Sequence, residues 1–274
     1  MNPVERAALD GVELEYELAG SGEPVVLIHA GVCAEWFAPL LAQPTLRDRF
    51  RILSYHRAGY AGSSRPTGAL TIADNAEHCH ALMRAVGIER AHLVGHSSSA
   101  MMALQLALDH PEAVRSLVLL ESARPALQNE QEQEFVRTVA QPALERFAAG
   151  DHAGAVDAWM RGVCAPDYRA TFEAAIPGAF DRAIADAPTF FAQELPAVRA
   201  WSFTEQDARR ITQPVLAVLG AESRATFGER RQLLLDWLPN AEPYDLPDAN
   251  HLLHVQNPGG AADALAGFFA RHPL

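Results

Sequence analysis

The 274-residue sequence contains no lysine, and all 22 of its basic residues are arginines. Schiff-base enzymes and P-loop nucleotide hydrolases both need a lysine amine, so the sequence excludes these two classes. Positive charge is also scarce, because 34 Asp and Glu residues bring the net charge to −12. With no basic patch, the chain is not expected to bind nucleic acid or a membrane surface. A small neutral or apolar partner fits this composition better.

Cysteines and long apolar runs are also few. Cys33, Cys79 and Cys164 lie far apart and in no C-x-x-C spacing, which argues against a disulfide framework and against a structural zinc site. No apolar run reaches the roughly 20 residues that span a membrane, and the first 20 residues lack the pattern of a secretory signal. We therefore expect a cytoplasmic protein with buried thiols. The sequence leaves the oligomeric state open.

Strands and helices are predicted to alternate. Short apolar runs typical of strands covered on both faces lie at 25–28, 52–53, 93–94, 117–120 and 215–219, and residues 12–18 alternate as an edge strand does. Helical spacing occurs over about 72–87, 98–109, 226–237 and 258–271, with Gly87 as a C-cap and Pro258 in a first turn. This order predicts an α/β fold with a mostly parallel, doubly wound sheet.

Residues 123–212 interrupt the alternation. They contain six prolines, no good strand run and ten of the 21 aromatic residues, which predicts several short helices with an apolar lining. We interpret them as an inserted helical cap on a core formed by residues 1–122 and 213–274. Candidate substrate-binding side chains are Trp159, Phe190, Phe191 and Trp201 in the cap, together with His254 in the core.

The strongest chemical signal is an apolar strand that runs into Gly95-His96-Ser97-Ser98-Ser99 and then into a helix. Such a sharp turn strains the backbone of its central residue, requires small neighbours and presents the serine at the carboxyl edge of the sheet. Ser97 is therefore the candidate nucleophile. The Ser98 backbone N–H lies at the helix N-terminus, where it can stabilise an oxyanion.

Together with further motifs, this turn resembles that of the α/β-hydrolase family, and the resemblance covers essentially the whole chain. The motifs are Leu27-Ile28-His29-Ala30-Gly31, Tyr55 to Ser63, His110 to Val114, and Asn250-His251 followed by Gln256 and Pro258. The resemblance implies a second oxyanion donor at the Gly31 N–H. Departures from the family pattern include Ala30, His56, Ser99 and Asn250.

A serine nucleophile needs a base that titrates near neutrality, and histidine is the natural choice. The family pattern counted back from Pro258 selects His251, with His254 as the rival. His78 and His80 are two residues apart on a predicted helix and point to opposite sides, so we expect no metal pair there.

The acid that orients the histidine is less certain, because Ser223 occupies the slot where most of the family has Asp. Glu121, at the end of the sixth predicted strand, is the preferred replacement, since family members that resemble zearalenone lactonases carry Glu there. Glu222 is the alternative.

The function implied is a serine hydrolase that cleaves a small to medium, largely apolar carboxylic ester or lactone through an acyl-enzyme on Ser97, with no cofactor and no metal. A serine nucleophile disfavours dehalogenase and epoxide hydrolase chemistry, which needs a carboxylate. Two alternatives stay open: a hydrolase of carbon–carbon bonds in β-diketone-type substrates, which a basic pocket would favour, and a non-catalytic ligand sensor on the same fold.

Overall fold

The computed structural model describes residues 4–123 and 129–274. The beginning of the predicted cap, which includes Pro125, lies outside the described residues. Within them, none of the helices has both the length and the apolar character needed to cross a membrane.

Eight strands form one sheet in the order β1-β2-β4-β3-β5-β6-β7-β8. β1 and β2 pair antiparallel, and β2 joins β4 antiparallel, whereas the strands from β4 to β8 are parallel. The predicted α/β fold with a mostly parallel sheet is confirmed. The strands are β1 (Glu5–Leu9), β2 (Val12–Ala19), β3 (Glu23–Ile28), β4 (Phe50–Tyr55), β5 (Ala91–His96), β6 (Val114–Leu120), β7 (Val215–Gly220) and β8 (Ala241–Leu246).

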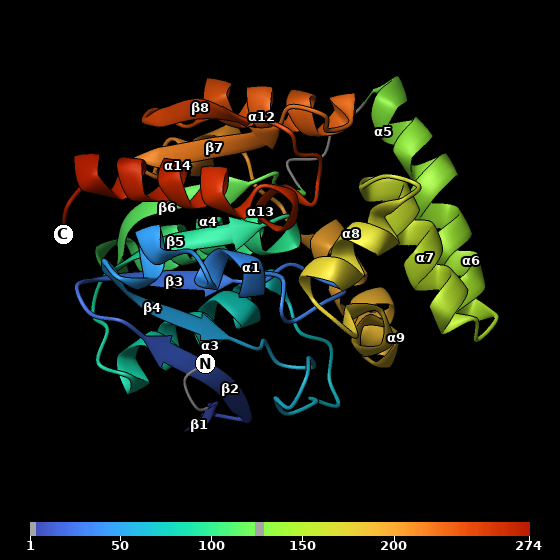
Figure 1. Cartoon of the computed structure of the whole chain (residues 1–274), viewed down its shortest axis with the longest axis horizontal. Helices are drawn as coiled ribbons and strands as arrows, with labels where there is room; N and C mark the ends of the chain where they lie inside the picture. Colours follow the sequence, from blue (N-terminus) through green and yellow to red (C-terminus); the bar gives the residue numbers. More distant parts are fainter. Residues whose placement is uncertain (1–3, 124–128) are drawn as a thin grey trace.

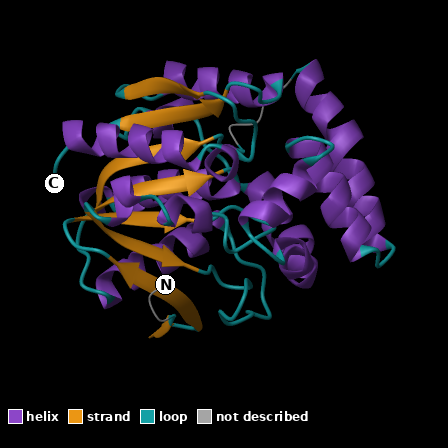
Figure 2. Ribbon diagram, viewed as in Figure 1, coloured by secondary structure: helices purple, strands orange, loops and turns teal. Residues whose placement is uncertain are grey.

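Helices cover both faces of this sheet, as Figures 1 and 2 show. Successive side chains of a strand point to opposite faces, so Val26 packs with α3 and α4 whereas Val25 packs with α1 and α14. Both faces are apolar for this reason. The helices of the core are α1 (Ala38–Leu41), α2 (Pro44–Arg47), α3 (Ile72–Ala85), α4 (Ser98–Asp109), the 3₁₀ turn η1 (Pro111–Ala113), α12 (Ala225–Trp237), α13 (Leu253–Gln256) and α14 (Pro258–Arg271).

Local sequence signals set the ends of these helices. Thr71 and Asp74 form a capping box at the start of α3, and Gly87 follows its end with φ +70°, a conformation that glycine adopts readily. Pro258 is the first residue of α14, and the Asn257 side chain accepts a hydrogen bond from the Gly260 N–H.

Between β6 and β7, the described residues from 129 onward are mainly helical and lie over the carboxyl ends of the strands, at the right of Figure 1. This segment has its own apolar cluster, which also contacts core residues Trp36 and Phe227. Two π-helical turns make continuous helices from Glu130 to Ala148 and from Ala179 to Ala200. The elements are α5 (Glu130–Phe135), η2 (Val136–Ala140), α6 (Gln141–Ala148), α7 (His152–Val163), α8 (Tyr168–Ala175), α9 (Ala179–Thr189), η3 (Phe190–Glu194), α10 (Leu195–Ala200) and α11 (Glu205–Ala208).

Candidate active site

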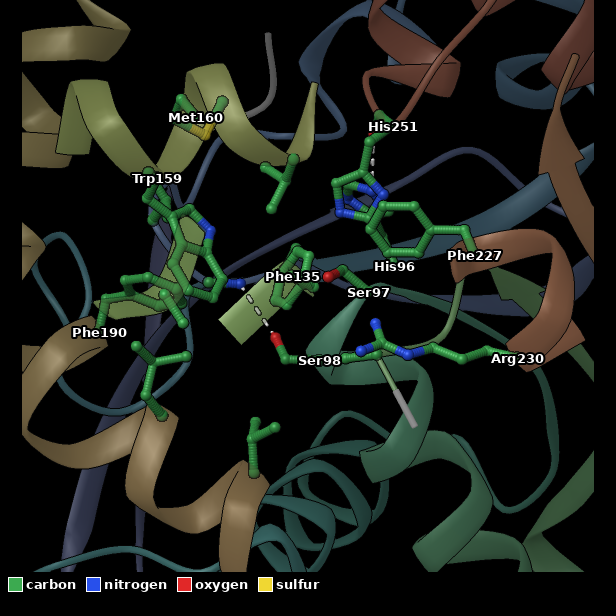
Figure 3. A pocket seen from close by; sticks show the side chains of 18 of the residues that line it. His96, Ser97, Ser98, Phe135, Trp159, Met160, Phe190, Phe227, Arg230 and His251 are labelled. Atoms are coloured by element: carbon green, nitrogen blue, oxygen red, sulfur yellow. Dashed lines mark hydrogen bonds between the residues drawn. The ribbon is translucent and has the colours of Figure 1, made fainter. Parts of the chain in front are cut away.

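The turn between β5 and α4 holds Ser97 in a strained conformation, with φ 55° and ψ −115°. The strained turn leaves no room beside it: a Cβ on Gly95 would lie 2.6 Å from the Ser99 carbonyl oxygen. The Ser99 hydroxyl accepts a hydrogen bond from the His96 N–H at 2.8 Å and donates to the Ile28 carbonyl, which ties the turn to β3. This geometry presents the Ser97 side chain to a cavity between the sheet and the helices above it (Figure 3).

Glu121 directly follows β6, with φ +46° and a side chain buried from solvent. Its Oε2 accepts a hydrogen bond from His251 Nδ1 at 2.7 Å. Its Oε1 accepts one from the Gly220 N–H at 2.7 Å and another from the Ser223 hydroxyl. Ser223, in the family's usual acid slot, thus supports the carboxylate, whereas Glu222 is exposed.

The His251 ring is fixed in one orientation. A carboxylate accepts hydrogen bonds only, so the contact with Glu121 places the hydrogen on Nδ1 and leaves Nε2 free to take a proton. Phe227 stacks on the ring with centroids 4.2 Å apart, and the His251 carbonyl lies 3.1 Å from His96 Nε2. Figure 3 shows His251 and Ser97 at the same cavity.

His254, the rival base, does not line this cavity. It is fully buried, stacks on Phe37 with centroids 4.6 Å apart, and has no hydrogen-bond partner on either ring nitrogen within the described residues. Burial, and to a smaller extent the charge of His251, lowers the pKa of His254 to about 3. Burial likewise lowers the pKa of His96 well below its ordinary value. Both rings are therefore neutral near pH 7.

The two predicted oxyanion donors lie next to each other. Gly31 donates its backbone N–H to Ser98 Oγ at 3.2 Å, drawn as a dashed line in Figure 3. Ser98 is the first residue of α4, where backbone N–H groups have no acceptor within the helix. Gly31 has no space for a side chain, because a Cβ there would lie 2.4 Å from the Phe190 ring and 2.8 Å from Glu194 Oε1.

Behind the oxyanion donors lies a buried polar cluster centred on Glu194 of η3. Its carboxylate accepts hydrogen bonds from the Ser98 hydroxyl, from the Tyr60 hydroxyl and from Arg57 Nη2, the last at 2.8 Å. Burial, followed by the charge of Glu194, raises the pKa of Tyr60 well above its ordinary value, so this hydroxyl stays a donor. The sequence analysis did not identify Glu194; Arg57 lay within a motif, which is a signal for fold rather than for this contact.

The cavity has a volume of about 140 Å³ and is mostly apolar. Of the four cap side chains proposed to bind substrate, Trp159 and Phe190 line this cavity, whereas Phe191 and Trp201 do not. The Phe191 ring stacks on Phe147 inside the cap. Trp201 packs instead against the apolar cluster of α3 and α4. It stacks on Phe203 and donates its indole N–H to Gln105. The described residues around the cavity are Ala30, Gly31, Val32, Trp36, His96, Ser97, Ser98, Ala123, Glu132, Phe135, Val136, Ala140, Trp159, Met160, Val163, Phe190, Leu195, Val198, Arg199, Phe227, Arg230 and His251.

One group of side chains in the described part of the chain has the composition and spacing of a metal site. Glu77, His80 and His110 have ligand atoms within 4.8 Å of one another, on the surface and away from the cavity. The two rings stack face to face with centroids 3.7 Å apart, and Glu77 accepts a hydrogen bond from His110 at 2.8 Å. The hydrogen bond between His110 and Glu77 and the contact of the two rings account for the closeness of these three side chains.

Comparisons with known proteins agree with the observed fold. The family model described as alpha/beta hydrolase fold matches residues 23–258. The putative carbamate hydrolase RutD of Klebsiella pneumoniae strain 342 is 28% identical over 241 residues, which cover 85% of this chain and 86% of that protein.

Two further matches differ in extent. The 2-hydroxymuconate semialdehyde hydrolase of Pseudomonas sp. strain CF600 is 37% identical over 117 residues, or 41% of each chain. The enol-lactonase from Burkholderia xenovorans LB400 superposes with a TM-score of 0.83 at 21% identity, over 97% of this chain and 100% of that one, a likeness of fold.

Proposed function

The chain belongs to the alpha/beta hydrolase fold family, and we propose that it is a serine hydrolase of small to medium, largely apolar carboxylic esters or lactones. The membership confirms the predicted family and, with relatives that are hydrolases, the prediction of an enzyme. The observation that carries the finer proposal is the 2.7 Å hydrogen bond from His251 Nδ1 to buried Glu121, beside a cavity that Ser97 lines from a strained turn.

In the proposed reaction, His251 Nε2 accepts the Ser97 proton as Ser97 Oγ attacks the carbonyl carbon. Glu121 holds Nδ1–H and stabilises the imidazolium that forms. The developing oxyanion is bound by the Ser98 and Gly31 N–H groups, the latter exchanging Ser98 Oγ for the substrate oxygen.

Collapse of the tetrahedral intermediate breaks the bond to the leaving oxygen, which takes the proton from His251. His251 then removes a proton from water, the hydroxide attacks the acyl carbon, and Ser97 leaves as the alcohol. A mostly apolar cavity suits an uncharged acyl or alcohol group and excludes bulk water from the reacting atoms.

The cavity also bears on the alternative of carbon–carbon bond cleavage, for which the Pseudomonas relative is named. A pocket with an unpaired cation would favour the carboxylate of such a substrate. The buried cation of this cavity, Arg230, is instead paired with Glu132 at 2.6 Å, which supports the ester or lactone proposal. The Glu121–His251 pair argues in the same way against a non-catalytic sensor, which has no use for it.

The test is labelling by a fluorophosphonate probe together with turnover of p-nitrophenyl esters, lactones and a carbamate. We expect the wild-type protein to be labelled and to hydrolyse esters or lactones, and Ser97→Ala to lose both with an unchanged melting temperature. Ser99→Ala is less suitable as a control because its hydroxyl holds the turn; Ser122→Ala, outside the cavity lining, serves instead. A wild-type protein that is neither labelled nor active on any ester or lactone contradicts the proposal.

A further inference from the structure

The cavity wall contains a buried arginine that the proposed reaction does not use. Arg230 extends from α12 toward the cavity that Ser97 and Ser98 also line (Figure 3), and only 4% of its surface is exposed. Its guanidinium lies over the rings of Phe135 and Phe227, at 5.4 Å and 5.6 Å from their centroids. Burying a cation is costly, so a position that holds one at a cavity wall calls for a reason.

The donors of Arg230 are only partly used. Within the described residues, its guanidinium donates one hydrogen bond, from Nη2 to Glu132 at 2.6 Å, and its buried Nε has no partner. A guanidinium carries five N–H donors. The wall of the cavity therefore contains donor capacity that the described residues do not satisfy.

This capacity lies close to the proposed reacting atoms. The Phe227 ring over which Arg230 lies also stacks on the His251 ring, with centroids 4.2 Å apart. A substrate whose carbonyl carbon is at Ser97 therefore lies in the same cavity as Arg230 and can present a second oxygen to it.

The charge of the ligand group follows from Glu132. Its carboxylate already balances Arg230, and it lines the same cavity. A substrate carboxylate would be repelled by Glu132, whereas a neutral oxygen can accept a hydrogen bond from Arg230 and leave the ion pair intact. The remaining wall is mostly aliphatic and aromatic, so Arg230 and Glu132 form a largely buried polar spot in this wall, separate from the exposed Arg199.

We propose that Arg230, neutralised by Glu132, binds a second, uncharged oxygen of the substrate, such as a ketone, amide or hydroxyl oxygen, a few bonds from the carbonyl that is cleaved. This inference rests on the proposed function and narrows it. The preferred substrates are esters or lactones with a neutral polar group, rather than plain alkyl esters or half-esters of dicarboxylic acids.

The experiment compares esters that differ in one group only. On the acyl side these are methyl pentanoate, methyl 4-oxopentanoate and monomethyl succinate; on the alcohol side they are the butanoates of pentanol, 5-hydroxypentan-2-one and 4-hydroxybutanoate. Values of kcat/KM are measured by pH-stat and divided by the rate of hydroxide hydrolysis. In at least one series, we expect the ketone to exceed the alkyl ester by about tenfold, because a hydrogen bond to a charged donor is strong.

Substitutions at Arg230 and at Glu132 test the role of each charge separately. Arg230→Gln should remove the ketone advantage while it leaves the alkyl ester within a few-fold. Glu132→Gln leaves Arg230 unbalanced and should raise the relative kcat/KM of the half-ester by about tenfold. The matched control is Glu229→Gln: Glu229 neighbours Arg230 and accepts a hydrogen bond from Asn129 at the same junction, but it does not line the cavity.

The outcomes separate the two proposals. Hydrolysis of every ester with the same ratios in wild type and Arg230→Gln overturns the role of Arg230 and leaves the serine hydrolase standing. A wild type that prefers the half-ester overturns the choice of a neutral group. A wild type inactive on all esters and lactones contradicts the proposed function itself. If Arg230→Gln fails to fold, the shift in half-ester preference in Glu132→Gln decides, since that variant keeps the arginine.

Discussion

The sheet edge and the helical segment above it hold their site residues in different ways. At the sheet edge, Ser97 and Glu121 follow adjacent parallel strands and both adopt positive φ, so backbone turns fix their positions. Above it, Phe190 and Glu194 reach the site from a π-helical turn, and their positions depend on side chains packed against distant residues. The proposed reacting groups are thus positioned by local backbone geometry, and the proposed surroundings of the substrate by long-range packing.

The largest effect expected from the sheet edge is that of Glu121→Gln. A neutral amide in this position cannot stabilise the imidazolium and favours the wrong ring tautomer, so kcat should fall by about 10³ to 10⁴. Glu222→Gln, at the exposed alternative acid, should change kcat less than about twofold. Steady-state kinetics on one ester measure both, and equal losses in the two variants would contradict the assignment of Glu121.

The next largest effect is a loss of stability in the helical segment above the sheet, caused by Glu194→Gln in η3. This change leaves the buried guanidinium of Arg57 without its anion, which typically costs about 3–5 kcal/mol of stability. Glu132→Gln removes the anion from the other buried arginine, but its side chain is 20% exposed against 4% for Glu194. Urea unfolding should therefore show a smaller loss of unfolding free energy for Glu132→Gln than for Glu194→Gln. A larger loss for Glu132→Gln would contradict this expectation.

A third test uses two glycines with crowded surroundings. Gly95→Ala places a Cβ 2.6 Å from a backbone oxygen of α4, whereas Gly162→Ala in α7 places one 2.3 Å from a side-chain carbon of Val139. Backbone in the strained turn cannot give way as a side chain can, so we expect Gly95→Ala to cost roughly 1–3 kcal/mol and activity as well. Gly162→Ala should retain activity. Thermal melts and kcat together distinguish the two.

The last effect is that of acid, which acts through histidines buried in the core. Burial lowers the pKa of His92 to about 4 and that of His254 to about 3, so each ring is neutral when folded. In the unfolded chain these histidines bind protons below about pH 6.5. Their contribution to the free energy of unfolding is therefore fully present above that pH and is lost as the pH falls towards 3. The loss is at most about 1.4 kcal/mol for each histidine and each pH unit.

His254→Phe should flatten this dependence, because it removes one such group and keeps a ring beside Phe37. Unfolding free energies at pH 7, 5.5 and 4.5 measure the slope. A variant with the slope of the wild type would show that His254 is not among the groups responsible.

The sequence predicted the sheet edge far better than the upper segment. Apolar runs and a G-x-S turn are local patterns, so the strands and the position of Ser97 at the end of β5 could be read directly. Strand β1 was not predicted, because its residues Glu5–Leu9 are partly exposed and form no apolar run. The partner of His251 was narrowed to two carboxylates, and only the three-dimensional structure shows Glu121 in contact with it.

For the upper segment, composition indicated aromatic walls but not which ring faces the cavity. Phe190 and Phe191 are neighbours on a helical turn, so their side chains point in directions roughly 100° apart and one of the two turns away. Arg230 and Glu194 gave no local signal at all, because each acquires its environment from residues about 100 or more positions distant.

The pairing of Arg230 with Glu132 also bears on how a reaction cycle ends. Ester hydrolysis converts an uncharged substrate into an acid that ionises near neutral pH. In the proposed reaction the buried guanidinium already has its counter-ion, so the newly formed anion gains no compensating charge from Arg230 and is solvated better by water. If the proposed ester hydrolysis takes place here, we expect the ion pair to favour departure of the acid over its retention and so to limit inhibition by the product.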